Sequence, residues 1–541
     1  MRRWPLSLSV TTWLVVAGLA QAVSLAWPLD DAWRGVPQGW LQVASLAALA
    51  AVLDRSRSVS QAFAQAWVFA WAWLTGSTWW LFISLHTYGE LAAPLAALAV
   101  LLLAAGLALL YGAAGAVFHR VCGRTQLGVL ARALSFASVW VLAEWARGTL
   151  WTGFPWGAGG YAHVEGLMRH WAPWVGVYGL SALSAGLAMT LVAYRTYIAS
   201  RKWVASSVTA VLCVTLGWMW FTSPSHTDTH AANITSTQPL RVTLLQGNIP
   251  QDLKFGATGV GRALRDYREA LLASTSDLTV TPETALPMSP EQLPEGYWAG
   301  VQQHFSKGTQ AALIGVPLAQ RSVDGQRQYS NSALGLMPQT TPAATATYQY
   351  DKHHLVPFGE FVPPLFQWFV RMLNIPLGDF TRGEVVQPAM HVKGERIAPN
   401  ICYEDLFGEE LARSFADPHK APTMLVNLSN IAWFGDTVAI DQHLHISRMR
   451  ALELGRPMLR ATNTGATAII NAQGEVTHRL PSAVAGALTA EVRGVHGPVT
   501  PYARWVSAWG LWPLVGVALL TLLAVALLAH AGRHGPRRFG P

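Results

Sequence analysis

Three residues of this chain have the types that acyl-transfer chemistry requires: a thiol, a carboxylate and a lysine. Cys402, Glu283 and Lys352 each stand just after a short run that reads as a strand. In α/β domains, reactive groups commonly lie just past the ends of strands. A thiol serves as nucleophile, a carboxylate takes its proton, and a cation stabilises the developing oxyanion. We therefore predict that the three side chains form one acyl-transfer site.

The sequence around Cys402 predicts a strand followed by a helix. Arg396–Ile401 has the pattern of a short buried strand, and Leu406–Phe415 has helical spacing and opens with acidic residues. Backbone N–H groups and the positive end of the dipole lower the pKa of a thiol at a helix N-terminus. The alternative is that Cys402 is a small buried hydrophobe with no chemical role.

The composition is that of a membrane protein. Of the 541 residues, 51% are hydrophobic and 13% are charged, and 25 are tryptophan. The net charge is +8, but the basic residues lie between apolar runs and at the two ends, so no nucleic-acid partner is expected. Cys122 and Cys213 fall in or beside the apolar region, which leaves Cys402 without a disulfide partner in its own domain.

Eight apolar stretches are long enough, or nearly long enough, to cross a bilayer. They are Leu6–Trp27, Trp40–Leu53, Gln61–Leu85, Leu91–Phe118, Ala131–Ala146, Pro173–Tyr194, Trp203–Phe221 and Trp505–Ala529. The fold class that follows is a multi-pass α-helical membrane domain with eight transmembrane helices. Seven of these fall within residues 1–221, and the eighth lies in residues 501–541 with a basic tail.

The Lys and Arg residues of the short loops set the orientation of such a bundle. With the N-terminus in the cytoplasm, eight basic residues in loops and five at the chain ends fall inside, and three fall outside. This bias predicts an extracytoplasmic location for the long segment from Thr222 to about Thr500.

That segment has the pattern of a separate α/β domain, with a polar linker at residues 222–238 and the domain itself at 239–500. Strands that alternate with helices predict packed α and β layers. The predicted strands are Arg241–Gln246, Leu278–Thr281, Ala311–Val316, Ser332–Met337, Thr345–Tyr350, Arg396–Ile401, Thr423–Asn427 and Ala466–Asn471. The predicted helices are Val260–Ser274, Glu291–Phe305, Leu406–Phe415 and Asp441–Leu454.

The three candidate residues resemble the Glu-Lys-Cys triad of the nitrilase, or carbon–nitrogen hydrolase, superfamily. Other runs narrow the resemblance to the membrane branch of that superfamily, the apolipoprotein N-acyltransferases. These runs are Leu245–Gln251, Pro282–Ala285, Lys352–Phe361, Cys402–Glu404, Asn430–Asp436, Arg448–Glu453 with Arg456-Pro457, and Gly153–Trp156 in the apolar part. The resemblance implies a nitrilase-like α-β-β-α sandwich outside a bacterial inner membrane, on its periplasmic side.

The resemblance also implies a reaction: N-acylation of the N-terminal diacylglyceryl-cysteine of lipoproteins, the last step of their maturation. A membrane phospholipid would acylate Cys402 to a thioester, and the lipoprotein amine would then discharge it in a ping-pong course. Glu283 would be the general base, which favours a raised carboxylate pKa. Lys352 and the N–H of Tyr403 would stabilise the oxyanion. No cofactor and no metal are implied, and a monomer is expected.

Further residues take roles by the same resemblance. Those expected to support the triad are Glu360, Tyr403 and Glu404, and those expected to line the substrate site are Phe255, Phe358, Trp368 and Trp433. Phe255 stands where the family has a functionally important tryptophan, and Thr281 where it often has Trp before Pro-Glu. The apolar run Phe361–Phe380 is either core or, as we prefer, an arm that lies on the bilayer and admits lipid.

Two other readings are open. A membrane-tethered amidase would use the same triad with water as second nucleophile, and a transmembrane sensor would carry an inactive nitrilase-like domain. The intact triad argues against the sensor, and eight spans argue against a small-molecule amidase, which needs only one anchor. The pairs His353-His354 and His443/His445 do not indicate a metal site, because no carboxylate or cysteine at suitable spacing completes a ligand set.

Overall fold

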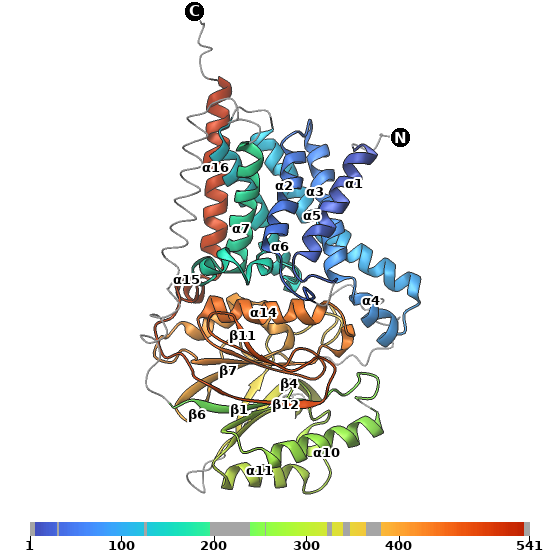
Figure 1. Cartoon of the computed structure of the whole chain (residues 1–541), viewed down its shortest axis with the longest axis vertical. Coiled ribbons are helices and arrows are strands. Elements are labelled where there is room, and N and C mark those ends of the chain that lie inside the picture. Colours follow the sequence, from blue (N-terminus) through green and yellow to red (C-terminus); the bar gives the residue numbers. More distant parts are fainter. Residues whose placement is uncertain are drawn as a thin grey trace, which may run out of the picture. The chain divides into compact units, whose positions relative to one another are not determined.

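The computed structural model describes residues 6–29, 32–123, 127–194, 238–254, 256–321, 327–338, 347–363 and 380–534. It divides into two compact units, which are described separately (Figure 1). One is helical and comprises Met1–Trp79, Ala97–Pro224 and Trp509–Pro541. The other comprises Ser225–Ala508 together with the short segment Trp80–Ala96.

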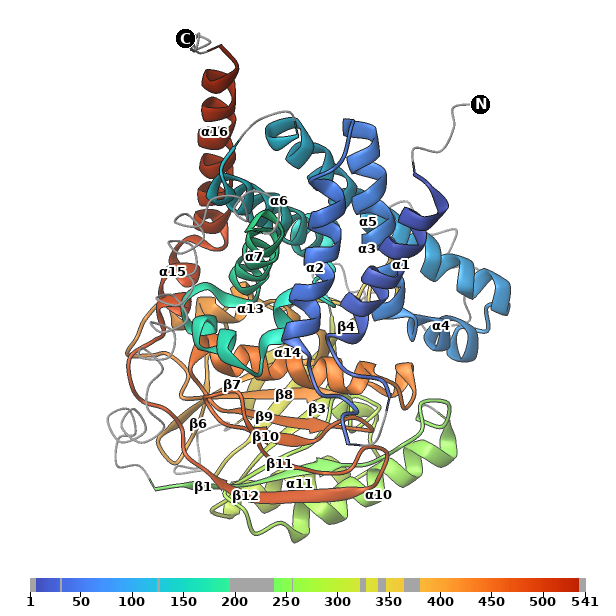
Figure 2. The same cartoon turned by 45° about the horizontal axis from the view of Figure 1, so that its top comes forward.

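The helical unit is built from apolar helices in the stretches that the sequence predicted. They are α1 (Leu8–Val23), α2 (Gly39–Leu53), α3 (Val59–Thr78), α5 (Ala93–Cys122), α6 (Val129–Thr149), α7 (Ala172–Ala193) and α16 (Trp512–His534). Helices α1, α2 and α3 pack side by side (Figure 2). Small residues permit this close packing: a Cβ added to Gly18 of α1 would lie 2.3 Å from the carbonyl oxygen of Phe69 in α3.

Within the described residues, four helical segments are long and apolar enough to cross a membrane: Ala93–Cys122, Val129–Thr152, Leu167–Ala193 and Trp512–Ala531. A fifth is possible if α3 and the segment Leu81–Tyr88 count together, although they are bent by 61°. Helices α1 and α2 are apolar but shorter. The predicted seventh span, Trp203–Phe221, lies outside the described residues, so the count of eight stays a prediction.

Two predicted spans are broken in the structure. The third, Gln61–Leu85, ends as a straight helix at Thr78 and continues as α4 (Leu81–Ile83) and a π-helical turn. The eighth is divided into α15 (Pro501–Trp509) and α16. Gly510 stands at this second break with φ 58°, a left-handed conformation that commonly ends a helix.

The second unit contains two six-stranded sheets. The first has the order β12 (Gly486–Val492), β1 (Leu240–Gln246), β2 (Leu278–Val280), β3 (Ala311–Arg321), β4 (Arg327–Leu336) and β5 (Thr347–Asp351). The second has the order β11 (Val476–Arg479), β10 (Ala468–Ile470), β9 (Met458–Thr462), β8 (Met424–Ser429), β7 (Glu395–Ile401) and β6 (Met390–Val392). In each sheet three neighbouring strands are parallel, β1–β2–β3 and β7–β8–β9, so their carboxyl ends share an edge.

The two sheets pack face to face. Apolar side chains such as Val242 and Leu313 of the first sheet and Ile397 and Val426 of the second form one buried cluster. Helices α10 (Ala257–Ala273) and α11 (Tyr297–Lys307) cover the outer face of the first sheet, and α14 (Ala439–Leu454) packs against β9 of the second (Figure 1). The predicted α-β-β-α sandwich is therefore confirmed.

All eight predicted strands are present, and β6, β9, β11 and β12 are additional. The predicted helix Leu406–Phe415 is wrong. In its place are a 3-10 turn from Cys402 to Leu406, a four-residue helix α13 (Gly408–Leu411) and a second 3-10 turn (Ala412–Phe415). The break falls at Phe407, whose φ of −103° and ψ of 74° are not helical. Gly408, the next residue, packs on the guanidinium of Arg450, where an added Cβ would lie 2.2 Å from Nη1.

Candidate active site

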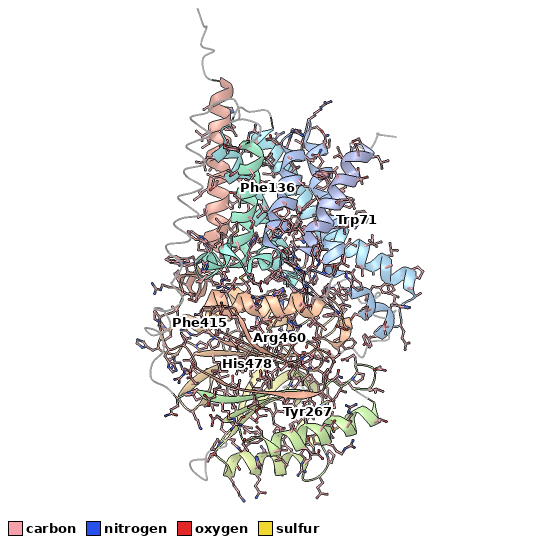
Figure 3. All side chains as sticks on the ribbon, in the orientation of Figure 1. Trp71, Phe136, Tyr267, Phe415, Arg460 and His478 are labelled. Atoms are coloured by element: carbon pink, nitrogen blue, oxygen red, sulfur yellow. The ribbon has the colours of Figure 1, made fainter. Side chains whose placement is uncertain are left out.

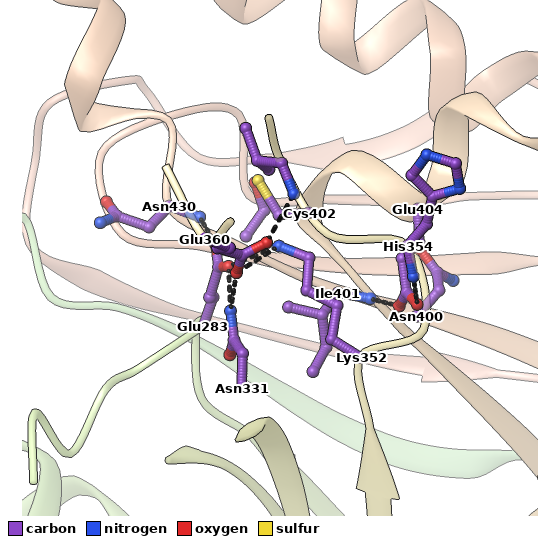
Figure 4. A network of polar contacts seen from close by, with 12 residues as sticks. Glu283, Asn331, Lys352, His354, Glu360, Asn400, Ile401, Cys402, Glu404 and Asn430 are labelled. Atoms are coloured by element: carbon purple, nitrogen blue, oxygen red, sulfur yellow. Dashed lines mark hydrogen bonds and ion pairs between the residues drawn. The ribbon is translucent and has the colours of Figure 1, made fainter. Parts of the chain in front are cut away.

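The fold brings the three predicted reactive residues together (Figure 4). Glu283 follows β2, Cys402 follows β7 directly, and Lys352 follows β5. Strands β2 and β7 belong to different sheets, each among the parallel strands of its own sheet. Because the sheets face each other, loops that are distant in sequence converge at one edge of the sandwich.

A lysine and an amide lie between two carboxylates at this edge. Lys352 Nζ lies 3.2 Å from Oε1 of Glu283 and 2.9 Å from Oε1 of Glu360. Asn331 Nδ2, from β4, donates to the same two oxygens over 2.8 and 2.7 Å (Figure 4). The other oxygen of Glu360 accepts the backbone N–H of Val356 at 2.8 Å. This network fixes both carboxylates relative to the lysine.

The pKa of Glu283 lies below the ordinary carboxylate value, which contradicts the raised pKa that we expected. Burial alone would raise it, but Lys352 and Lys254 both favour the ionised form. The second oxygen of Glu283 also accepts the backbone N–H of Asn430 at 2.9 Å. Lys254 Nζ donates to the backbone carbonyl of Glu283 at 3.2 Å, and burial lowers the pKa of this lysine to about 8.

The pKa of Cys402 is shifted in the opposite direction to our prediction. Burial raises it to about 12, the charge of Glu283 adds to the increase, and Lys352 opposes it. A 3-10 turn of five residues stands where we expected a longer helix, so little helix dipole is available to lower it. Cys402 has φ 54°, an uncommon conformation for a residue with a side chain. The site therefore holds a neutral thiol beside an ionised carboxylate.

Glu404 ties the turn of Cys402 to the loop of Lys352. One of its oxygens accepts the N–H groups of His353 and His354 at 2.7 and 3.2 Å. The other accepts the N–H of Ile401 at 2.6 Å and the hydroxyl of Tyr350 at 2.9 Å. Burial outweighs these donors and raises the pKa of Glu404 to about 7. The carboxylate thus acts as a buried brace between two loops.

Two of the predicted aromatic residues contact other rings of the domain. The ring of Tyr403 packs 5.3 Å from that of Phe407. Phe358 has φ 62°, and Trp433 meets Tyr88 edge-on with centroids 5.6 Å apart. Phe255 and Trp368 lie outside the described residues, as does most of the predicted arm, from residue 364 to 379. The substrate-binding roles of these residues stay predictions.

The histidine pairs contact carboxylates that the sequence spacing did not reveal. His354 Nδ1 lies 3.0 Å from Glu410, and His443 Nε2 lies 3.0 Å from Asp405. Over the described part of the chain, no group of three or more His, Cys, Asp and Glu side chains converges as a metal site would require. Through these contacts His354 and His443 belong to the hydrogen-bond network of the domain.

Sequence reasoning missed several residues of the site. Lys254, Asn331 and Asn427 are all nearly or completely buried, with exposed fractions of 4%, 6% and 0%. The sequence did contain one indication of two of them, because Asn331 and Asn427 are polar residues within or next to predicted buried strands. A buried amide requires hydrogen-bond partners, so such a residue indicates a polar network.

Comparison with known proteins shows which families this architecture belongs to. The family model for carbon–nitrogen hydrolases matches residues 241–495, which cover both sheets. The second unit is thus a carbon–nitrogen hydrolase domain. Among solved structures, the chain is similar to an amidase from Nesterenkonia sp., with 16% identity, a TM-score of 0.34, and coverage of 49% of this chain and 94% of that one.

A second family model, the apolipoprotein N-acyltransferase N-terminal domain, matches residues 17–190. The chain is 51% identical to an apolipoprotein N-acyltransferase of Verminephrobacter eiseniae, covering 92% of this chain and 93% of the relative. It is 46% identical to one of Ralstonia nicotianae, covering 92% and 90%. This chain belongs to the apolipoprotein N-acyltransferase family.

Proposed function

We propose that this protein transfers an acyl chain from a membrane phospholipid to the N-terminal diacylglyceryl-cysteine of lipoproteins, with Glu283, Lys352 and Cys402 as its catalytic triad. The observation that carries this proposal is the convergence of Cys402 with Glu283 and Lys352, whose Oε1 and Nζ lie 3.2 Å apart (Figure 4). The lowered pKa of Glu283 and the raised pKa of Cys402 agree with it. A base must be unprotonated and the nucleophile must still hold the proton before a general-base step begins. Family membership supports the choice of substrates.

In the first step, Glu283 takes the thiol proton as the sulfur of Cys402 attacks the ester carbonyl carbon of the phospholipid. Lys352 and the backbone N–H of Tyr403 stabilise the oxyanion, and one such donor is worth about 10²–10³ in rate. The intermediate collapses with cleavage of the ester C–O bond. The leaving alkoxide takes the proton from Glu283 and departs as a lysophospholipid, which leaves a thioester on Cys402.

In the second step, the lipoprotein's neutral α-amine attacks the thioester carbonyl and Glu283 accepts a proton from the amine. The C–S bond breaks, the amide product leaves, and the Cys402 sulfur regains its proton from Glu283. Each half-reaction returns the carboxylate to its ionised form. The course is ping-pong, because the first product leaves before the amine reacts.

The remaining residues complete the proposal. Glu360 positions Lys352, and Glu404 positions the turn of Cys402. Tyr403 supplies its backbone N–H to the oxyanion. The residues that line the lipid site are Phe255, Phe358, Trp368 and Trp433. The protein resides in the bacterial inner membrane with eight spans and a periplasmic catalytic domain, as the distribution of basic residues supports. It works as a monomer without a cofactor.

The amidase-like alternative differs only in the second nucleophile, so the decisive experiment omits the amine. With phospholipid vesicles alone, intact-mass measurement should show a long-lived acyl-enzyme, with about one lysophospholipid released per protein because water is excluded. A diacylglyceryl-cysteine peptide should then discharge it and start turnover. Cys402→Ala should form no acyl-enzyme, while Cys122→Ala should behave as the wild type. Steady release of free fatty acid without an amine would instead identify a hydrolase.

A further inference from the structure

The peptide bond between Cys402 and Tyr403 is held from its carbonyl side by two buried side chains. Asn427 Nδ2, from β8, lies 3.2 Å from the carbonyl oxygen of Cys402, and His443 Nε2, from α14, lies 3.4 Å from it. In a planar trans peptide the C=O and N–H bonds point in opposite directions. Fixing the carbonyl of Cys402 therefore also fixes the direction of the Tyr403 N–H.

The orientation of the Asn427 amide follows from its other contacts. Its nitrogen also donates to Oδ1 of Asn400 at 2.7 Å, and its oxygen accepts from Nη1 of Arg460 at 3.3 Å. Arginine can only donate, so the amide oxygen faces Arg460 and the amide nitrogen faces Cys402. Asn427 is completely buried. Its amide can therefore not turn over without losing all three bonds.

The tautomer of His443 follows from the same arginine. Nη2 of Arg460 lies 2.6 Å from Nδ1 of His443, which must therefore be the unprotonated, accepting nitrogen. The proton of the neutral ring is then on Nε2, where it faces Asp405 Oδ1 at 3.0 Å and the Cys402 carbonyl. Burial and the charge of Arg460 lower the pKa of His443, against the opposing effect of Asp405, so the ring is neutral.

Arg460 is the centre of this network. It lies on β9 and is completely buried (Figure 3). Its Nη1 lies 2.6 Å from the hydroxyl of Ser447 and 3.3 Å from Oδ2 of Asp405. The same Asp405 oxygen accepts the hydroxyl of Ser447 at 2.5 Å. Strands β8 and β9, helix α14 and the Cys402 turn are thereby joined behind the nucleophile.

We infer that Asn427 and His443 are positioning residues that aim the Tyr403 N–H at the oxyanion and polarise the Cys402–Tyr403 peptide. This inference rests on the proposed function, in which that N–H is an oxyanion donor. A peptide whose carbonyl accepts two hydrogen bonds is a stronger donor through its N–H, because hydrogen bonds in a chain polarise one another. The peptide held in this way follows a residue with the uncommon φ of 54°.

Two reactions of one thiol separate this role from a general effect on the fold. Acylation of Cys402 by phospholipid or by a p-nitrophenyl ester builds an oxyanion, whereas alkylation by iodoacetamide does not. In Asn427→Leu and His443→Phe, acylation should fall about 10- to 100-fold, with unchanged half-saturating phospholipid. This is less than the roughly 10²–10³-fold loss for a missing oxyanion donor, because the N–H itself remains. The rate of alkylation by iodoacetamide, which builds no oxyanion, should change less than about threefold in the same variants. His443→Gln keeps an N–H donor and should retain most of the acylation rate.

The control is His445→Phe, in the same helix, since His445 is also buried but contacts Arg448 instead. Both reactions should be unchanged in this variant. If His443→Phe does not fold, the milder Asn427→Ser takes its place, because it shortens the side chain without adding bulk. Equal losses of acylation and alkylation, or unchanged acylation in both Asn427 and His443 variants, would overturn the inference.

The two acyl donors keep this test separate from that of the proposed function. A wild-type protein that is acylated by the p-nitrophenyl ester but not by phospholipid contradicts the proposed donor, while the positioning role is still measured with the ester. If the wild-type protein is alkylated at Cys402 but acylated by neither the ester nor the phospholipid, both the proposed function and the positioning role are overturned.

Discussion

The backbone N–H of Asn430 donates to Oε2 of Glu283 over 2.9 Å, and these residues are 147 positions apart in the chain. Asn430 follows β8 of the second sheet and Glu283 follows β2 of the first. The bond therefore joins the two sheets at the edge where Cys402 lies. Burial would raise the pKa of this carboxyl, but Lys352 and Lys254 and the side chain of Asn331 hold it below the ordinary value.

The first prediction concerns the reactivity of the thiol. Because burial raises the pKa of Cys402 to about 12, the thiolate fraction should increase about tenfold per pH unit between pH 7 and pH 10. Alkylation of Cys402 by iodoacetamide, followed by intact mass, should increase with the same slope and show no plateau. A plateau below pH 8 would show a lowered pKa, as at the helix N-terminus that the sequence suggested.

The second prediction concerns Lys352. Lys352→Met removes a cation from two carboxylates, so burial should raise the pKa of Glu283 above its ordinary value of 4.5. The ionised base is present above its pKa and lost as pH falls through it. The acid limb of the acylation pH profile should therefore move towards neutral pH, and the plateau rate should fall about 10²–10³-fold.

Lys352→Arg is the matched control for this prediction. It keeps the charge, so the acid limb should stay near that of the wild type, although the longer guanidinium will not reproduce the geometry at the oxyanion. An unchanged acid limb in Lys352→Met would show that Lys352 does not control the ionisation of Glu283.

The third prediction concerns the brace formed by Glu404. Glu404→Gln replaces an acceptor of four hydrogen bonds by an amide whose NH₂ faces N–H donors. Leaving a buried donor unsatisfied costs about 1–3 kcal/mol, so the free energy of unfolding should fall by at least that amount. Thermal unfolding measures the effect, with the exposed Glu295→Gln as control. Equal melting temperatures of the two variants would show that the four hydrogen bonds of Glu404 do not stabilise the fold.

The fourth prediction concerns the orientation of the chain. The charge bias predicts that residues 239–500 lie in the periplasm and that both ends lie in the cytoplasm. A reporter that is active only in the periplasm should work when fused after Gly300 and should be inactive when fused after Arg538. Activity of the second fusion would exclude an even number of spans.

Several features were predictable from the sequence because they depend on residue type and local pattern. The alternation of strands and helices predicted the layered fold, and apolar length predicted the helices of the first unit. The triad residues were found because each follows a strand. The helix after Cys402 was predicted wrongly, since the chain leaves the helical conformation at Phe407, which the helical spacing of Leu406–Phe415 does not reveal.

The sequence by itself determined which groups are available: one thiol, one lysine and one carboxylate at the ends of strands, in a chain with long apolar stretches. Only the tertiary structure decided their protonation and their partners. Asn331 reaches Glu283 across 48 positions, and Asn427 reaches the Cys402 carbonyl across 25. A pKa depends on burial and on charges within a few ångströms in space, and these distances are set when the two sheets pack together.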